Sequence, residues 1–323
     1  MSGRIVLVGV CLLVVCILVG PAYAQTVPGM LVQEYASLDS PLEMTFDASG
    51  VMYVGHGDGQ GLARIYRIGI GGTPIEEYGD APTPDPDSVL YDATGALTGV
   101  PGSVLVAGHL SPGVSRFSAI RPDQAVMTLF ETPGVLGNPQ GMDLDSLNRA
   151  IAAGQDGSVY LFSESGATFE HLFTLPTLNR KVSVDRALDY IYTAPNDGTI
   201  RVHDILGNPV SDGIFADDLM TDISNPIAVG PGGALWDHYL YAVDKTVGNL
   251  IGYDAFGTGT VIGTGFGSAD SGVADLAFGP DGALYVSFGN ADRIVRIIPE
   301  PATATLLLCL LVAIGSARRT VRD

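Results

Sequence analysis

Short apolar segments separated by Gly, Asp and Pro residues make up most of the chain between residues 25 and 299. Each segment is about four to six residues long, which is the usual length of a buried strand. No window in this region sustains the apolar period of about 3.6 residues that an amphipathic helix needs. The pattern therefore predicts an all-β domain.

One unit recurs in this region: an apolar strand, an Asp/Gly/Pro turn, a second strand, a polar turn and a third strand. The first turn residues of the copies are Asp47, Asp92, Asp145, Asp185, Gly230 and Gly279, at spacings of 40 to 53 residues. These spacings are typical of β-propeller blades, in which small sheets stack radially. Six copies predict a six-bladed β-propeller; seven blades or a β-sandwich are the alternatives.

The two ends of the repeat region predict how the ring closes. The last copy stops after its third strand near Ile298, while an unassigned strand lies at Met30–Ser37. We expect this N-terminal strand to supply the missing fourth strand, because an open blade edge would otherwise be left unpaired. The Pro- and Asp-rich stretch from Gly79 to Ser88 is interpreted as a solvated loop between the first two blades.

Residues 1–24 have the pattern of a secretory signal peptide with an apolar helix. Arg4 precedes an apolar run from Ile5 to Val19, and Ala22-Tyr23-Ala24 is a small-x-small cleavage site. A lipoprotein signal is the alternative, but Val precedes both Cys11 and Cys16, where a small residue is required. Cleavage after Ala24 is expected, and the propeller domain is assigned to residues 25–298.

The C-terminal segment, residues 299–323, has three parts. The motif Pro299-Glu300-Pro301 is followed by an apolar run at 302–317, expected to be helical, and by a basic end at 318–323 with Arg318, Arg319 and Arg322. A permanent membrane helix is the alternative, but the run is shorter than the ~20 residues that span a bilayer. The arrangement resembles the PEP-CTERM sorting signal, although Thr320, Val321 and Asp323 interrupt or follow the arginines. The resemblance implies an exosortase partner, transient membrane insertion with the arginines in the cytoplasm, and a Gram-negative-type organism that makes extracellular polysaccharide.

The cysteine positions and the net charge limit the disulfides and the binding partners expected of the domain. All three cysteines, Cys11, Cys16 and Cys309, fall in the terminal segments, so the propeller has no disulfide. The domain retains 12 basic and 33 acidic residues, a net charge near −21. Such a charge repels nucleic acid and favours solubility and cations such as calcium.

The residue pattern of the repeats, clearest in the stretch from Phe278 to Ile298, resembles that of the NHL-repeat and gluconolactonase-like six-bladed propellers. The resemblance implies a divalent cation on one face of the ring and an enzyme acting on a lactone or sugar. The Glu-x-x-x-Trp spacing usual in those enzymes is not reproduced by Glu43 and Phe46. The run DLAFGPDGALYVS, which begins at Asp275, also resembles quinone-dependent sugar dehydrogenases, which form a third class of candidate.

Motifs for catalysis are absent from the sequence, and no catalytic residue is assigned. There is no G-x-S-x-G, the five histidines are scattered, and no zinc or EF-hand pattern occurs. Glu43 and Asp275 occupy matching positions in the first and last copies, which adjoin in a closed ring. Two such carboxylates are predicted as a calcium site; the alternative is that they cap strand ends.

A ring of polar residues is predicted around one mouth of the channel, at strand starts and second-strand turns. Its members are His56, Asp58, His109, Gln140, Asp156, Asn196, Asp244 and Asn290. The two histidines are interpreted as ordinary turn residues. A shared role in binding is the alternative. The single tryptophan, Trp236, is expected to pack against a neighbouring blade; an exposed sugar platform is the alternative.

The sequence thus favours an exported, non-catalytic propeller at the cell envelope or surface, which binds glycan or another exported protein. The alternative is a cation-dependent enzyme of gluconolactonase-like type.

Overall fold

The computed structural model describes residues 25–57, 62–111, 114–133, 138–163, 168–219, 225–232, 236–267 and 272–299. The signal segment 1–24, Asp58 and everything after Pro299 lie outside these ranges, so the expected flanking helices are not among the elements described. Within the ranges the fold is all-β, with a single 3₁₀ turn. No helix there is both long and apolar enough to cross a membrane.

The elements in chain order are β1 (Met30–Ser37), β2 (Pro41–Phe46), β3 (Met52–His56), β4 (Leu62–Ile68), β5 (Ile75–Asp92), β6 (Ser103–Ser111), β7 (Val114–Ile120), β8 (Val126–Pro133), β9 (Pro139–Leu144), β10 (Ala150–Gly154), β11 (Ser158–Ser163), β12 (Thr168–Thr174), β13 (Asn179–Asp185), β14 (Tyr190–Pro195), β15 (Ile200–Asp204), β16 (Pro209–Ala216), β17 (Ile227–Val229), β18 (Leu240–Asp244), β19 (Asn249–Tyr253), β20 (Gly259–Thr264), β21 (Val273–Phe278), β22 (Leu284–Phe288), the 3₁₀ turn η2 (Gly289–Ala291) and β23 (Arg293–Pro299).

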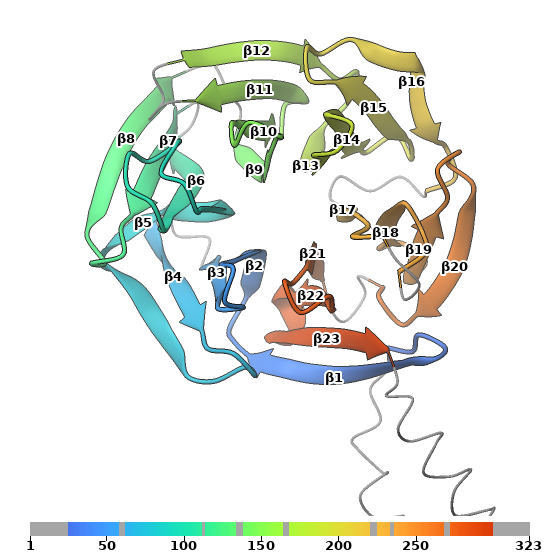
Figure 1. The fold of residues 1–323 in the computed structure, drawn as a ribbon, viewed down its shortest axis with the longest axis horizontal. Helices are drawn as coiled ribbons and strands as arrows, with labels where there is room; N and C mark the ends of the chain where they lie inside the picture. The colour runs from blue at the N-terminus through green and yellow to red at the C-terminus, as the bar shows by residue number, and fades with distance from the viewer. Residues whose placement is uncertain are drawn as a thin grey trace, which may run out of the picture.

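These strands form a β-propeller (Figure 1). Four antiparallel four-stranded sheets comprise β9–β12, β13–β16, β17–β20, and β21–β23 with β1; a seven-stranded sheet, β2–β8, completes the ring. The first strand of each unit lies nearest the centre and the later strands lie progressively outward (Figure 1). The predicted fold class, a β-propeller, is confirmed.

The seven-stranded sheet is continuous because β5 is long enough to pair with β4 over its first part and with β6 over its second part. Its first part, Ile75–Pro84, pairs with β4, and its second part, Asp85–Asp92, pairs with β6. The stretch from Gly79 to Ser88, predicted as a solvated loop, is therefore strand, and that prediction is wrong. Proline is tolerated there because each part of β5 pairs with another strand along one edge only. A proline whose nitrogen lies on the unpaired edge removes no hydrogen bond of the sheet.

The ring closes through β1, as predicted. Met30–Ser37 runs antiparallel to β23, with Met30 opposite Pro299 and Ser37 opposite Arg293. The first strand of the chain is thus the outermost strand of the last sheet, so the two ends of the domain are joined by a backbone ladder instead of a disulfide.

The core lies between neighbouring sheets. The second strands β10, β18 and β22 are buried at every position, because each is covered by a sheet on both faces. In the outer strand β16, half of the positions are exposed. Trp236 is buried, donates its indole N–H to the carbonyl of Gly282 at 2.7 Å, and packs edge-on against Phe278. Its expected burial against a neighbouring sheet is confirmed.

Tight turns explain why Asp and Gly recur between the strands. Oδ1 of Asp47 accepts the backbone N–H groups of Ser49 and Val51 at 2.9 Å each, and Gly50 takes the left-handed φ of +93° that closes the turn. Turns that join first to second strands gather at one end of the central channel, which we call the turn face. We call the opposite end, where second strands turn into third strands, the rim face.

Candidate functional site: the central channel

Channel-facing side chains connect each inner strand to the next around the ring. Oδ2 of Asp275 in β21 accepts the backbone N–H of Met44 in β2 at 2.9 Å. Oε2 of Glu43 accepts the N–H of Val89 in the second part of β5 at 3.0 Å, and also the hydroxyl of Ser88. Inner strands have no partner strand on their channel edge, so their N–H groups need acceptors from elsewhere.

The same link recurs one layer nearer the turn face. Thr45 accepts the N–H of Tyr91 at 3.1 Å, and Asp143 accepts the N–H of Val184 at 2.7 Å. Ser183 continues the series by accepting the N–H of Val229 at 3.0 Å. Polar residues of the channel wall therefore join neighbouring sheets. This structural role is close to the alternative in which such residues cap strand ends.

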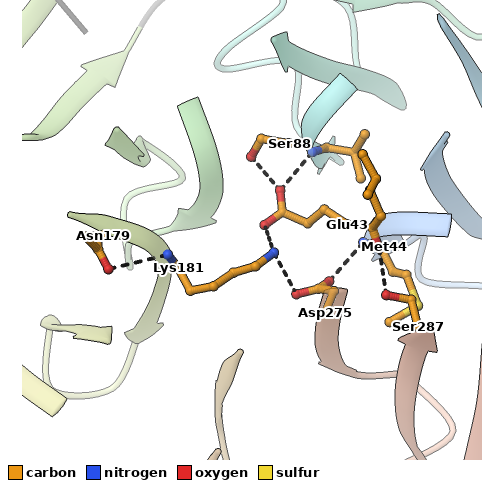
Figure 2. Close-up of polar contacts among 9 residues, drawn as sticks. Glu43, Met44, Ser88, Asn179, Lys181, Asp275 and Ser287 are labelled. Carbon is orange, nitrogen blue, oxygen red and sulfur yellow. Dashed lines mark hydrogen bonds and ion pairs between the residues drawn. The ribbon is translucent and has the colours of Figure 1, made fainter. Parts of the chain in front are cut away.

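Lys181 of β13 lies between the two predicted carboxylates (Figure 2). Its Nζ is 3.2 Å from Oε1 of Glu43 and 3.3 Å from Oδ1 of Asp275. All three residues are buried, at 6% exposure each. Figure 2 shows the lysine side chain extending toward Glu43 and Asp275 from the other side, so one ammonium group ties three inner strands together.

Burial and charge alter the titration of this cluster. Loss of water raises the pKa of Glu43 to about 8, an effect that Lys181 opposes and Asp275 reinforces. Burial would lower the pKa of Lys181, but the two carboxylates outweigh it and hold that pKa above its ordinary value. Lys181 is therefore an ammonium ion at neutral pH and is not available as a nucleophile.

The donor set of this cluster does not suit calcium. Glu43 and Asp275 come together as their matching repeat positions predicted, but an ammonium group stands where calcium was expected. One oxygen of each carboxylate already accepts a backbone N–H. Among the described residues, no group of three or more His, Cys, Asp and Glu is placed to bind a metal ion. Calcium prefers six to eight oxygen ligands, and no such shell is present here.

Two cavities meet at this cluster. The larger, of about 700 Å³, opens on the turn face and is lined by Thr45, Asp143, Ser183 and Arg186 among others. Burial raises the pKa of Asp143 to about 6, against the opposing N–H groups of Val184 and Leu144. The smaller, of about 300 Å³, opens on the rim face. Glu43 lines both cavities, so the ion cluster separates them.

Only part of the predicted rim lines the smaller cavity. Gln140 and Asn290 do so, together with Lys181 and Lys245. Asp244 is buried, and its Oδ1 accepts the N–H groups of Thr246 and Val247 at 3.1 and 3.2 Å, so it stabilises a turn.

The other predicted rim residues have local roles or lie elsewhere. Asp156 accepts the N–H of Ser158 at 3.1 Å, and the backbone N–H of Asn196 bonds to the carbonyl of Leu178 at 2.9 Å. His56 lies 3.4 Å from Asp39 and edge-on to Tyr66. His109 lies in β6 opposite Asp85. Asp58, Glu300, Pro301, Arg318, Arg319 and Arg322 lie outside the described residues, and Pro299 ends β23.

Sequence reasoning missed Lys181, Ser88 and Lys245, although a signal was present. Glu43, Ser88, Lys181 and Asp275 each lie four residues before the first turn residue of their copy. Lys181 and Lys245 are also the only two lysines in the chain, and both line the rim-face cavity. Alignment of all copies on their turns would have placed four of the cluster residues in one layer.

No protein-family model matches the chain, and no curated protein matches it in sequence. Solved structures match its fold. A gluconolactonase from Xanthomonas campestris is similar with a TM-score of 0.63 at 12% identity, over 84% of this chain and 89% of that one. An auxiliary nutrient binding protein from Bacteroides thetaiotaomicron gives 0.62 at 11%, over 84% and 77%. A streptogramin B lyase gives 0.56 at 13%, over 84% and 98%. At these identities the likeness shows the propeller fold alone.

Proposed function

We propose that this chain is a non-catalytic binding propeller exported to the cell envelope. The observation that carries the proposal is Lys181, whose Nζ fills the position between Glu43 and Asp275. A cation-dependent lactone- or sugar-acting enzyme needs open acidic ligands in the channel. Here the carboxylates are engaged by an ammonium group and by backbone N–H groups, which favours a structural channel and a binding surface.

We propose that the ring has six blades. The four four-stranded sheets account for four, and the seven-stranded sheet counts as two that share β5. The reason is that β5 is the outermost strand beside β4 and the innermost strand beside β6. This count agrees with the six sequence copies.

Export and sorting are proposed from the terminal segments. The signal peptide pattern at 1–24 and the PEP-CTERM-like tail at 299–323 support secretion, recognition of Pro299-Glu300-Pro301 by an exosortase-type enzyme, and membrane insertion of 302–317 before processing. The position of the motif supports this order, because β23 ends at Pro299 and the motif begins where the ring stops. The mature domain would then be displayed at the cell surface.

The ligand site that we propose is the rim-face cavity. Gln140 and Asn290 supply amide groups there, and Lys245 lines the same cavity. Its acidic lining residues are Glu43, which already contacts Lys181, and Asp87. Amides and an ammonium group bind the hydroxyl and carboxylate oxygens of sugars. A glycan, and in particular one that contains uronic acids, is therefore the ligand class that this cavity fits best.

Titration calorimetry with uronic-acid and neutral oligosaccharides tests the proposal. We expect heat of binding with the acidic sugars that is lost in Lys245→Met and weakened in Gln140→Ala. Arg64→Met is the matched control, because it removes a cation from β4, where Arg64 faces Glu77, away from the cavity. Hydrolysis of a lactone by the parent protein that requires an added divalent cation would instead establish the enzyme.

A further inference from the structure

The most exposed large apolar side chains of the described residues are concentrated on the turn face. They are Phe256 at 92%, Leu206 at 75%, Ile70 at 68%, Leu147 at 67% and Leu188 at 55% exposure. Each lies at the tip of a turn between a first and second strand or between a third and fourth strand. Because neighbouring strands are antiparallel, both kinds of turn lie at the same end of the ring. Isolated exposed apolar residues are common on proteins, but a shared face is not explained by chance exposure.

Four of these tips are presented by rigid turns. The backbone N–H of Leu147, Leu188, Leu206 and Phe256 each bonds to the carboxylate of an aspartate two or three residues earlier, at 2.9 to 3.2 Å. The backbone at each tip is therefore fixed by its own turn, and the side chain there is more than half exposed. These turns use Asp145 and Asp185, which are buried, and Asp204 and Asp254, so carboxylates lie in the turns beneath the tips.

The chain leaves the ring on this same face. Ile297 of β23 is opposite Leu284, the first residue after the turn from β21 to β22, and Pro299 lies two residues further in that direction. The apolar run begins at Ala302. Three residues of extended chain reach at most about 10 Å. If the run enters a bilayer, the turn-face end of β23 must lie within about 10 Å of it.

We propose that the turn face rests on the surface of the membrane in the inserted form, with the five apolar tips in the interface of a zwitterionic phospholipid bilayer. This inference rests on the membrane insertion that we proposed for the tail. Apolar tips gain by entering the interfacial region, whereas the carboxylates of their turns and the net charge near −21 disfavour anionic lipid. The same orientation directs the rim-face cavity away from the membrane, toward extracellular glycan.

Fluorescence quenching by brominated phosphatidylcholine tests this contact in residues 25–323, without the signal segment, reconstituted into vesicles. Phe256→Trp reports the turn face. Val247→Trp is the matched control, because Val247 is 54% exposed in the turn between β18 and β19 on the rim face. Trp236 is buried and common to both variants. We expect the Phe256→Trp signal to be quenched at least about twofold more than the Val247→Trp signal, and less so when phosphatidylglycerol replaces phosphatidylcholine.

Alkaline carbonate extraction of the same vesicles distinguishes failure of tail insertion from failure of the turn-face contact. Release of the protein by carbonate would overturn both tail insertion and the contact. Retention of the protein with equal quenching of the two variants would overturn the contact alone. A blue shift of Phe256→Trp that appears only with a sorting enzyme, without quenching by lipid, would show a protein surface in place of the bilayer.

Discussion

Glu43 and Asp275 are separated by most of the chain, yet both contact Nζ of Lys181, at 3.2 and 3.3 Å. Each carboxylate also accepts a backbone N–H from a neighbouring inner strand. The pair therefore has two structural connections: across the channel through the ammonium group and around the ring through the backbone. The predictions below separate these connections from a metal site.

Replacement of the ammonium group should destabilise the ring. Lys181→Met leaves the buried carboxyl groups of Glu43 and Asp275 without the ammonium group that both contact, and loss of one partner of a buried ion pair costs about 3–5 kcal/mol. Denaturant unfolding measures the loss. Lys245→Met is the control, since it changes the only other lysine. The triple variant Lys181→Met, Glu43→Gln, Asp275→Asn should recover much of the stability; an unchanged Lys181→Met protein would contradict a structural role for the cluster.

Stability should fall as pH rises through the titration of Glu43. Its pKa is raised from 4.5 to about 8, so between these values the folded state retains a proton that the unfolded state has released. The contribution is complete below pH 4.5 and is lost as pH approaches 8. The unfolding free energy of the parent minus that of Glu43→Gln, measured from pH 5 to 9, should fall as pH rises, by about 1.4 kcal/mol for each pH unit between the two pKa values. A pH-independent difference would argue against a raised pKa of Glu43.

Calcium should not stabilise the domain through Glu43 and Asp275. A ligand specific for the folded state adds about 2.7 kcal/mol at a hundredfold excess over its Kd, which would raise Tm by a few degrees. Because Nζ of Lys181 occupies the position between the two carboxyl groups, we expect equal Tm values with chelator and with millimolar calcium. A rise in Tm for the parent that disappears in Glu43→Gln and in Asp275→Asn would restore the calcium site.

Removal of β1 should destabilise the whole ring. Deletion of Met30–Ser37 exposes the edge of β23 and removes Ala36 from a core cluster that includes Met52 and Tyr285. We expect a large decrease in Tm with loss of cooperative unfolding. Tyr35→Phe, which removes the phenolic hydroxyl and its hydrogen bond to the carbonyl of Gly69 at 3.1 Å but keeps the strand, is the control. A truncated protein that melts at the parental temperature would show that β1 does not close the ring.

The central residue of the tail motif should decide sorting. Glu300→Ala is expected to leave unprocessed full-length protein in the membrane fraction, because the motif is the proposed recognition element. Asp323→Ala, which removes an acidic residue elsewhere in the tail, should be processed normally. Cell fractionation with immunoblotting measures both, and normal processing of Glu300→Ala would refute the sorting proposal.

The sequence by itself determined the propeller, the strand that closes it and the meeting of Glu43 with Asp275. These features depend on local regularities: turn residues at Asp47 or Gly279, short apolar strands between them, and one strand too few in the last copy. Adjacent copies in a closed ring must place matching positions side by side. Such inferences need the order of the repeats and no detail of side-chain packing.

Only the tertiary structure decided the chemistry of the channel. Lys181 lies 138 residues from Glu43 and 94 from Asp275 in sequence, and it reaches them because the centre of the ring brings non-neighbouring inner strands within one side-chain length. The continuity of β5 was likewise hidden, since prolines that punctuate turns elsewhere are tolerated along a sheet edge. Sequence periodicity reports which strands exist and in what order. What fills the space they enclose depends on side chains that meet across it, and no local pattern records that meeting.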